Sequence, residues 1–481
     1  MKEIIVDVGF NQTRVALIED KELAEVYIDL NEESRIAGNI YKGRVTNVLP
    51  GMQSAFVDIG LEKNAFIFVE DDEILKVGQQ IIVQVVKEAI DTKGPRVTMH
   101  ITLPGRLLVL MPSDDFVGIS RRISSDDERV RLKEMASSFK PEKMGLIVRT
   151  SSIGCTKEDF ATDVIFLVKL WETVLNRIKD TVAPSLVHKD LSLVYRTVRD
   201  LFNNDIDKLI INDKEQYEKI LKILEILDLT EPQMKTRVEY YPMIDDLFDR
   251  YELEKKISRL ASRKVWLKNK GYIVIDQTEA LTAIDVNTGK FVGSSNFEDT
   301  VYLTNMEAAK EIAKQLRLRD IGGIIIIDFI DMNNKNHEDA VIEILKTTLK
   351  KDRTKTNVLG MTQLGLLEMT RKKVKERIET ILLSACPYCD GEGKIPSNEM
   401  VARNIERGMI KILFETDAEA VLLEIGYDAN ADFIKALEER VSFLGKLHKK
   451  GIIVKLSTRL KAHEYVLRGC CADFENDKGC V

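Results

Sequence analysis

The sequence has no surplus of positive charge. Lys and Arg total 71 against 78 Asp and Glu, which leaves a formal net charge of −7 over 481 residues. Proteins that bind nucleic acid through a broad electrostatic surface are usually basic. The overall charge gives no support to such a surface, so any basic patch on this chain has to be local.

Long apolar runs are also missing. No stretch reaches the roughly 18 consecutive apolar residues that a transmembrane helix requires. The chain starts directly on a strand at Met1-Lys-Glu-Ile4, without the apolar core of a signal peptide. We therefore expect a soluble, cytoplasmic protein with no transmembrane segment.

Cysteine is scarce. Six cysteines in 481 residues are too few for a disulfide scaffold, and only Cys386 and Cys389 have the spacing of metal ligands. Two such thiolates span adjacent positions of a tetrahedral Zn²⁺ site. Because no second pair lies nearby, the simplest completion is the same pair from a second protomer. Redox catalysis is the alternative, but Gly391 and Gly393 favour a knuckle turn over the helix N-terminus that lowers a thiol pKa.

The sequence is long enough and hydrophobic enough to form several domains. Hydrophobic residues make up 44% of the chain, and its length favours about three domains or more. Short strands with Gly-rich turns over 36–100 are typical of a small OB-type barrel. Alternating strands and helices over 261–383 favour α/β structure, in which we expect the basic segment ending at Arg377 to be a helix facing solvent or RNA. The predicted fold class is therefore α/β and β multidomain.

Two apolar strands in the second half of the chain each end in a carboxylate. The first carries Asp285 and Asn287, and the second ends in Asp328. Apolar β-branched residues bury both strands, so the first acid beyond the buried part points into the crevice at the sheet edge. Carboxylates are the hard oxygen ligands that Mg²⁺ prefers. These residues are the predicted active site, and we expect the nearby Asp331 to support them.

The predicted barrel carries aromatic residues that have two interpretations. Phe56 and Phe66 either fill the barrel core or lie on its surface, where aromatic rings stack on bases for about 1–3 kcal/mol per base. Lys93 and Arg96, after the following turn, are placed to meet phosphates.

A second basic group follows a buried strand. Arg149 and Thr150 come directly after that strand. A guanidinium beside a hydroxyl suits a phosphate monoester, because guanidinium binds phosphate bidentately. The alternative from spacing alone is ordinary surface charge.

Taken together, the sequence resembles the ribonuclease E/G family over nearly the whole chain. The resemblance is carried by four motifs in family order, EALTAIDVNTG (Glu279–Gly289), RLRDIGGIIIIDFIDM (Arg317–Met332), GLLEMTR (Gly365–Arg371) and CPYC (Cys386–Cys389). An S1-type barrel lies upstream of them. The length is similar to that of family members without a long C-terminal scaffold.

The resemblance implies a division into domains. Residues 1–35 and 201–260 would together form an RNase H-like domain, interrupted by an S1-type RNA-binding OB-fold (36–100) and a 5′-sensor region (101–200). They would be followed by a DNase I-like catalytic subdomain (261–383), a zinc link (384–395) and a small αβ C-terminal oligomerisation domain (396–481). It also implies a homo-oligomer, a zinc-linked dimer whose pairing makes a tetramer.

The resemblance also implies roles for single residues. Asp285 and Asp328 would hold the catalytic Mg²⁺, and Asn287 would orient them. Phe56, Phe66 and Lys93 would clamp RNA near the metal, and Cys386 and Cys389 would share the structural Zn²⁺. The pocket for a 5′-monophosphate would consist of Gly105, Val109, Arg149, Thr150 and Lys355. At the last position the family has an arginine. Lysine keeps its charge but loses the bidentate fork, so we expect a weaker preference for 5′-monophosphate.

The implied function is that of a Mg²⁺-dependent endoribonuclease. It would cut single-stranded, AU-rich RNA by water attack, leave 5′-phosphate and 3′-hydroxyl ends, favour 5′-monophosphorylated substrates, and serve rRNA processing and mRNA turnover. Two alternatives stay open from the residues. An RNA-binding scaffold without chemistry has no need for acids at both strand ends, and a DNA nuclease uses the same carboxylates.

Overall fold

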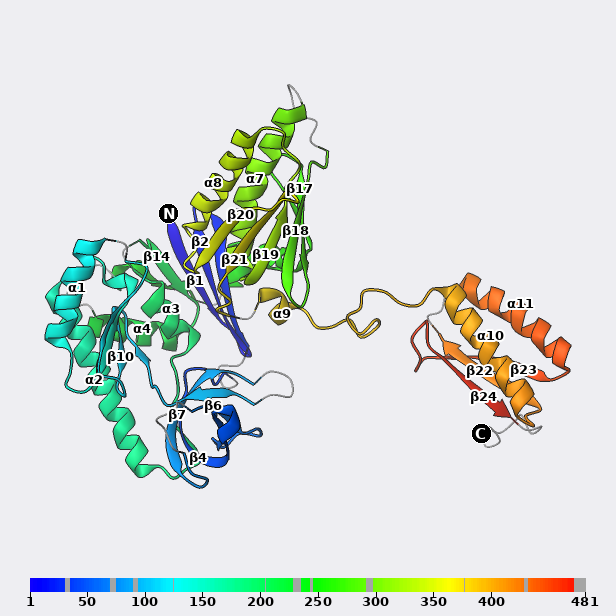
Figure 1. Ribbon diagram of the computed structural model, residues 1–481, viewed down its shortest axis with the longest axis horizontal. Helices are drawn as coiled ribbons and strands as arrows, with labels where there is room; N and C mark the ends of the chain where they lie inside the picture. Colours follow the sequence, from blue (N-terminus) through cyan, green and yellow to red (C-terminus); the bar gives the residue numbers. More distant parts are fainter. Residues whose placement is uncertain are drawn as a thin grey trace. The chain divides into compact units, whose positions relative to one another are not determined.

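The structure is a computed structural model (Figure 1). It describes residues 1–30, 35–69, 75–89, 94–123, 125–203, 205–227, 235–242, 245–290, 297–375, 377–427 and 431–470. The chain folds into two compact units, Met1–Leu382 and Leu383–Val481, and each is described by itself.

The first sheet of the larger unit joins the beginning of the chain to a segment about 200 residues later. Its strands, in spatial order, are β15 (Val238–Tyr240), β14 (Lys208–Ile211), β1 (Lys2–Val8), β2 (Gln12–Glu19) and β3 (Glu22–Leu30). Because neighbouring side chains of a strand point to opposite faces, Ile4 faces α3 (Leu193–Asp200) and α4 (Lys214–Leu227). Ile5 faces α5 (Leu247–Arg250) and α6 (Leu253–Ser258). Strands β14 and β15 of the later segment thus share one sheet with β1, β2 and β3.

The second element is a closed barrel. Its strands are β4 (Ile40–Leu49), β5 (Ser54–Asp58), β6 (Ala65–Phe68), β7 (Gln80–Lys87) and β8 (Arg96–Thr98). They pair in the order β4-β5-β6-β8-β7, and β7 pairs with β4 to close the ring. The barrel is of the OB type expected over 36–100.

The third sheet is formed by the part of the chain that follows the barrel. It consists of β11 (Val117–Ile119), β12 (Gly145–Val148), β10 (Leu108–Met111) and β9 (Leu103–Pro104), with helices α1 (Asp126–Phe139) and α2 (Lys157–Asp180). Trp171 of α2 is buried in this core, as its helical spacing predicts. The segment 101–200 is not self-contained, because β13 (Ser185–His188) pairs with β4 of the barrel and α3 packs on the first sheet.

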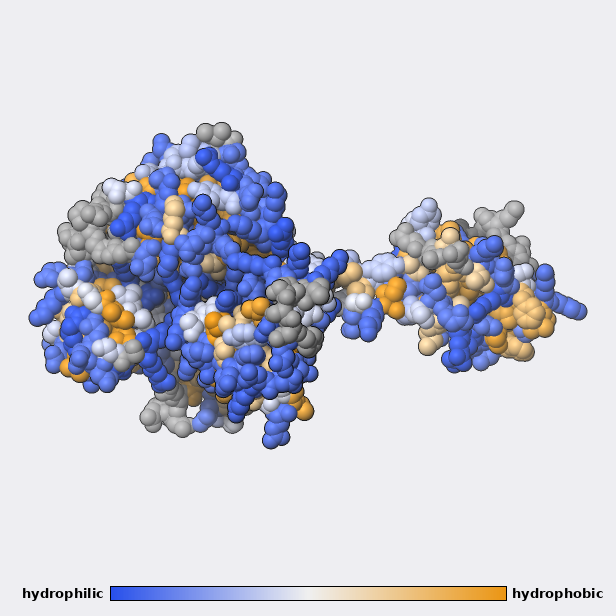
Figure 2. Space-filling view, turned by 90° about the horizontal axis from the view of Figure 1, so that it is seen from above, coloured by the Kyte–Doolittle hydropathy of each residue, from blue (hydrophilic) through white to orange (hydrophobic). Residues whose placement is uncertain are grey.

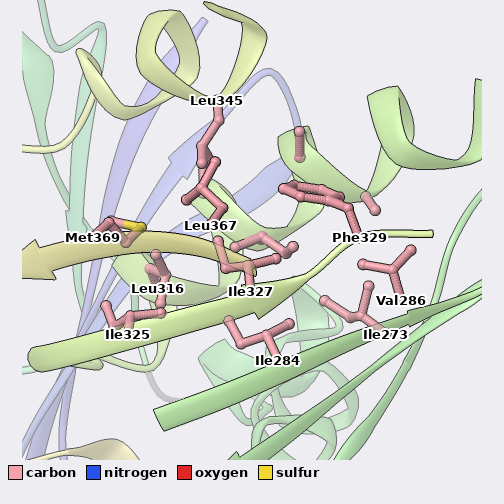
Figure 3. Packing of buried hydrophobic residues seen from close by; sticks show 14 of the residues in the cluster. Ile273, Ile284, Val286, Leu316, Ile325, Ile327, Phe329, Leu345, Leu367 and Met369 are labelled. Atoms are coloured by element: carbon pink, nitrogen blue, oxygen red, sulfur yellow. The ribbon is translucent and has the colours of Figure 1, made fainter. Parts of the chain in front are cut away.

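The fourth sheet carries the predicted active site. Its strands in order are β16 (Lys264–Trp266), β17 (Tyr272–Gln277), β18 (Leu281–Asn287), β19 (Gly323–Asp328), β21 (Leu366–Arg371) and β20 (Thr356–Met361). One face packs on α7 (Phe297–Leu318) and α8 (Lys335–Leu349). Figure 3 shows Ile284, Ile325 and Ile327 of the strands among Leu316 of α7 and Leu345 of α8. Among the described residues the opposite face is open, and Ala283, Asp285 and Ile324 on it are exposed.

One expectation for this region is wrong. The basic segment ending at Arg377 is not a helix, because β21 runs to Arg371 as a strand and a short helix, α9, begins only at Ile378 and ends at Leu382. Alternating burial of Leu367, Met369 and Arg371 fixes this strand. The lysines had suggested a solvent-facing helix, but the apolar residues follow a period of two.

The smaller unit is an αβ domain. Its elements are α10 (Asn398–Glu415), β22 (Ala420–Gly426), α11 (Ala431–His448), β23 (Gly451–Ser457) and β24 (Tyr465–Cys470), with strand order β23-β22-β24. The sequence predicts the first four elements, and β24 is an addition. In Figure 2 hydrophobic and hydrophilic residues are intermixed over the visible face of this unit. Within the described residues of the chain, no helix combines the length and apolar content needed to cross a membrane.

Candidate active site

The two predicted acids lie side by side on the fourth sheet. Strands β18 and β19 are parallel, and Asp285 pairs directly with Asp328 in their register. Neighbouring strands are about 4.8 Å apart. Ile284, Val286 and Ile327 turn inward toward the helices, so alternation turns both carboxylates to the open face, where they are exposed. The sequence placed these acids at one sheet edge, and the register makes them neighbours.

The pair concentrates negative charge. The pKa of Asp328 is raised, first by partial burial and then by the neighbouring carboxylates of Asp285 and Asp331. The side-chain amide of Asn287 donates a 2.7 Å hydrogen bond to Asp285 Oδ2. This bond holds the Asp285 carboxylate in one orientation. Asp331, which the sequence predicts to support the two acids, is close enough to act on Asp328 through its charge.

A buried asparagine fixes the loop that follows Asp328. Asn305 of α7 is fully buried. Its Nδ2 donates to the carbonyl of Ile330 at 2.7 Å, and its Oδ1 accepts from the Ile330 N–H at 3.1 Å. These two bonds set the course of the chain between Asp328 and Asp331. Sequence reasoning missed Asn305, whose only signal is an amide side chain on the face of α7 that also carries the buried Ala308, Ala309 and Ile312.

The donor set fits a hard divalent cation. Mg²⁺ sites typically use one or two protein carboxylates and leave the other positions to water and substrate phosphate. Asp285 and Asp328 provide two carboxylates whose mutual repulsion a cation would relieve. Among the described residues, no group of three or more His, Cys, Asp or Glu side chains is placed to hold a metal ion.

An aromatic cluster lies on the outside of the barrel. Phe56 and Phe66 are direct cross-strand partners, with ring centroids 5.9 Å apart in an edge-to-face arrangement. Phe68 adds a third ring 5.0 Å from Phe66 and is 54% exposed. None of the three belongs to the barrel core among the described residues, which consists of alternate residues such as Val57 and Ile67. The surface position is therefore correct for Phe56 and Phe66, and Phe68 joins them.

A cation accompanies the aromatic cluster. Arg96 pairs with Phe66 in the register of β8 with β6, and its guanidinium lies 4.7 Å from the Phe68 ring centroid. Positive charge and stacking surface are thus combined on one barrel face, the arrangement that binds single-stranded nucleic acid. Lys93, the third residue predicted to clamp RNA, lies outside the described residues.

The predicted phosphate pocket is partly assembled. Arg149 donates through Nη1 to the carbonyl of Gly105, and Thr150 Oγ1 lies 3.1 Å from Ser120 Oγ. Val109 is half-buried on β10, paired with the residue two before Arg149. The structure therefore brings Gly105, Arg149, Thr150 and Val109 into one neighbourhood.

Glycine is required at position 105. A Cβ there would lie 2.6 Å from Asp163 Oδ2. Asp163 is buried, and its carboxylate accepts hydrogen bonds from the N–H groups of Arg106, Leu107 and Leu108. This buried acid fixes the loop that presents the Gly105 carbonyl to Arg149.

An unpredicted carboxylate engages the pocket arginine. Asp200 accepts from Arg149 Nη2 at 2.7 Å and from Arg199 Nη2 at 2.9 Å. Burial alone would raise the pKa of Asp200, but Arg199 and Arg149 lower it overall. Asp200 therefore stays ionised, and a phosphate has to compete with it for Arg149.

The loop before β20 contacts Asp200, the residue whose carboxylate binds Arg149. Arg353 Nη1 donates to the Asp200 main-chain carbonyl at 3.0 Å. Lys355, two residues later, is exposed. The loop that carries Lys355 is thus tied beside Arg149 through Arg353, a residue to which no sequence pattern assigned a role.

The cysteine pair forms the expected tight turn in the smaller unit. Gly393 N–H donates to Cys389 Sγ at 3.2 Å. Backbone N–H groups of Cys389 and Tyr388 lower the pKa of the Cys386 thiol. Gly391 and Gly393 both have positive φ. N–H groups aimed at sulfur favour thiolates, which is the form that Zn²⁺ binds.

Comparison with known proteins gives a consistent result. The model of the "Ribonuclease E/G family" matches residues 102–374. Ribonuclease G of Salmonella typhimurium (strain SL1344) is 41% identical over 471 residues, which cover 92% of this chain and 95% of that protein. Ribonuclease G of Haemophilus influenzae is 42% identical over 470 residues, with the same coverage of 92% and 95%. Ribonuclease E of Escherichia coli (strain K12) is 36% identical over 416 residues, covering 82% of this chain and 39% of that longer protein.

Proposed function

The chain belongs to the ribonuclease E/G family and is an endoribonuclease, and from this premise we propose that it cuts single-stranded, AU-rich RNA in a Mg²⁺-dependent reaction. Asp285 and Asp328 hold the metal ion. The observation that carries the proposal is their direct pairing on the open face of the sheet. Water is the attacking group, so the products carry 5′-phosphate and 3′-hydroxyl ends.

Each part of the site has a defined task in this mechanism. When bound, Mg²⁺ neutralises charge on the reacting phosphate and lowers the pKa of water. Asn287 keeps the Asp285 carboxylate in place, and Asn305 holds the loop after Asp328. Phe56 and Phe66 hold unpaired bases by stacking. Bases in a duplex are stacked on each other and cannot reach these rings, which supports single-strand specificity.

The same proposal assigns the domain names. The first sheet with its helices corresponds to the RNase H-like domain, the barrel to the S1-type domain, and the fourth sheet to the DNase I-like subdomain. rRNA processing and mRNA turnover in the cytoplasm are the cellular roles we propose with it.

Removal of either barrel ring tests the RNA surface. We expect Phe56→Ala and Phe66→Ala each to weaken binding of a single-stranded RNA oligomer by about 5- to 150-fold, the equivalent of about 1–3 kcal/mol of lost stacking. Fluorescence anisotropy with labelled RNA measures this. Phe10→Ala, which removes a fully exposed ring from the turn after β1, is the matched control and should leave binding unchanged. Unchanged affinity in both barrel variants would contradict the role of this surface.

The phosphate pocket predicts a preference at the RNA 5′ end. We expect a 5′-monophosphorylated oligomer to be cut faster than its 5′-hydroxyl twin, and Arg149→Ala to bring the ratio of the two rates close to 1. A charge-assisted hydrogen bond contributes about 1.5–3 kcal/mol, which is about tenfold or more in rate.

Lys355→Arg is the gain-of-function counterpart. Arginine restores the bidentate fork, so we expect the rate ratio to rise above that of the natural chain. Lys372→Arg, a similar exchange after β21, serves as the control. A ratio near 1 for the natural chain, unaltered by either pocket substitution, would rule out a 5′-phosphate pocket here.

Zinc-linked assembly is the proposed role of the cysteine pair. Cys386 and Cys389 lie in a turn that prepares two thiolates, and a second chain would complete a tetrahedral site. Phe414, Phe443 and Leu447 of the same unit are exposed, which suits a further contact between copies. We propose a zinc-linked dimer and a dimer of dimers.

Loss of one thiol tests this assembly. We expect Cys386→Ser to lose the bound zinc and to halve the mass measured by light scattering, because a half-site cannot hold the ion. Cys155→Ser, which changes a half-buried thiol in the larger unit, should leave both unchanged. A Cys386→Ser chain with full zinc and unaltered mass would exclude the shared site.

A further inference from the structure

A second aromatic cluster lies on the open face of the fourth sheet. Trp266 on β16 pairs with Tyr272 on β17, and Tyr272 pairs with Asn287 on β18. In the next row, Lys264 connects by pairing through β17 to Asp285 and Asp328. The cluster therefore continues the same surface as the acids. Trp266 lies two strands from Asn287, about 10 Å at the usual strand spacing, and Asp285 is in the next row of the same face.

The three side chains contact one another and leave the indole uncovered. Trp266 and Tyr272 pack edge to face, with ring centroids 5.4 Å apart. Lys264 Nζ lies 4.3 Å from the Trp266 centroid and 3.5 Å from the Tyr272 centroid. Trp266 nevertheless remains 59% exposed. A large aromatic surface accompanied by a cation is thus presented to solvent.

A purely structural explanation does not account for Trp266. Strand β16 is at the edge of its sheet, and lysine on an edge strand hinders pairing with other chains. An exposed tryptophan has the opposite effect. Nor does packing require it, because the inward residue of β16 is Val265, which already contacts the core.

The positive charge of Lys264 favours an anionic partner, and the exposed rings favour one that can stack on them. The nearby acids repel an RNA backbone, and Lys264 places a compensating positive charge on their flank. Bases stack on aromatic side chains irrespective of sequence. The barrel cluster of Phe66, Phe68 and Arg96 combines the same elements, rings in edge-to-face contact with a cation over one of them.

We propose that Lys264, Trp266 and Tyr272 form a second base-stacking platform, which binds one nucleobase of the substrate strand beside the acids while Lys264 binds the adjoining phosphate. The proposal rests on the proposed function of the Asp285–Asp328 site. Its consequence is that the RNA strand is held at two separate surfaces, the barrel and the sheet.

Intrinsic fluorescence gives a direct test, because the chain has only two tryptophans and Trp171 is buried. In the full-length chain with Trp171→Phe and Asp328→Asn, Trp266 is the sole indole and cleavage is blocked. We expect a single-stranded AU-rich RNA oligomer to quench the emission of Trp266. The midpoint of the quenching should match the midpoint of RNA binding measured by anisotropy. Unchanged emission at saturating RNA would overturn the platform.

Kinetics of the otherwise natural chain give the second test. We expect Trp266→Ala to raise KM about 5- to 150-fold with little change in kcat, and Trp266→Phe, which keeps a ring, to recover most of the loss. Phe10→Ala is again the exposed-aromatic control.

The possible outcomes distinguish failure of the platform from failure of the proposed function of the Asp285–Asp328 site. If the natural chain cuts RNA but Trp266→Ala has an unaltered KM, the platform alone is overturned. If Trp266→Ala binds RNA normally and instead forms a smaller assembly by light scattering, the face is a contact between copies and the platform is also overturned. If the natural chain with Mg²⁺ does not cut RNA, both proposals are overturned.

Discussion

We expect the Asp328→Asn chain to cut single-stranded RNA at least about 10³-fold more slowly than the natural chain, with unaltered RNA affinity. Asparagine keeps the shape of the side chain but removes the charge that holds Mg²⁺, whose contribution to the transition state is several kcal/mol. In our proposal the barrel rings bind the RNA, and the substitution does not touch them. Asp285→Asn should have the same effect, because the two acids are direct neighbours in the sheet.

The matched control is Asp276→Asn. Asp276 lies on the adjacent strand β17, one strand from Asp285, and pairs with Arg263. We expect its rate to stay within a few-fold of the natural chain. Single-turnover cleavage gives the rates, and anisotropy gives the affinities. Natural rates in either Asp285→Asn or Asp328→Asn would refute the assignment of the active site.

The second large effect concerns stability. We expect Arg371→Met to lower the free energy of unfolding of the larger unit by about 3–5 kcal/mol, because it leaves buried carboxylates without their cation. Arg371 is 3% exposed. Its guanidinium donates to Asp352 at 2.7 Å, Asp320 at 2.7 Å, the Ile321 carbonyl at 3.0 Å and Thr354 at 3.2 Å.

Urea unfolding followed by tryptophan emission measures this, since both tryptophans belong to the larger unit. Arg131→Met is the control. It removes an exposed ion pair with Glu128, so its effect should be within about 1 kcal/mol. A similarly small effect for Arg371→Met would show that the buried network does not support the sheet.

The buried, structural role of Arg371 could not be predicted from the sequence. The GLLEMTR motif leads into a basic segment. A charged residue is expected at the surface unless a buried partner for it is known. In the fold, Arg371 joins β21 to the loop before β20. Arg317 of the RLRD motif likewise binds Glu19 at 2.9 Å and Glu25 at 2.8 Å, and so joins α7 to the first sheet. Both arginines belong to the motifs of the family, and both hold layers together.

The phosphate pocket was predictable only in part. Arg149 and Thr150 stood out because they directly follow a buried strand, which is local information. Asp200 contacts Arg149 across 51 residues of chain, and Arg353 contacts Asp200 across 153 residues. No periodicity signals such contacts. Arg371 fixes Asp352 and Thr354, and Arg353 between them reaches Asp200. The loop that carries Lys355 is therefore positioned from the catalytic sheet on one side and the pocket on the other.

The candidate active site followed from local patterns. Strand alternation turns every second residue to the same face, so Asp285 and Asn287 had to lie opposite Ile284 and Val286. The same rule left Phe56 either inside or outside the barrel, and only the resemblance to the family favoured the outside. What the alternation could not supply is register. Only the pairing of β18 with β19 makes Asp328 the neighbour of Asp285, and only that of β16 with β17 brings Trp266 beside Tyr272.

The central claim is that the paired acids direct water at a phosphodiester of single-stranded RNA. End-group analysis of an AU-rich RNA oligomer cut by the natural chain with Mg²⁺ tests this most directly, with the DNA oligomer of the same sequence alongside. We expect cleavage of the RNA alone, with 5′-phosphate and 3′-hydroxyl ends. Products with 5′-hydroxyl and cyclic phosphate ends, which arise when the ribose hydroxyl attacks in place of water, would contradict it.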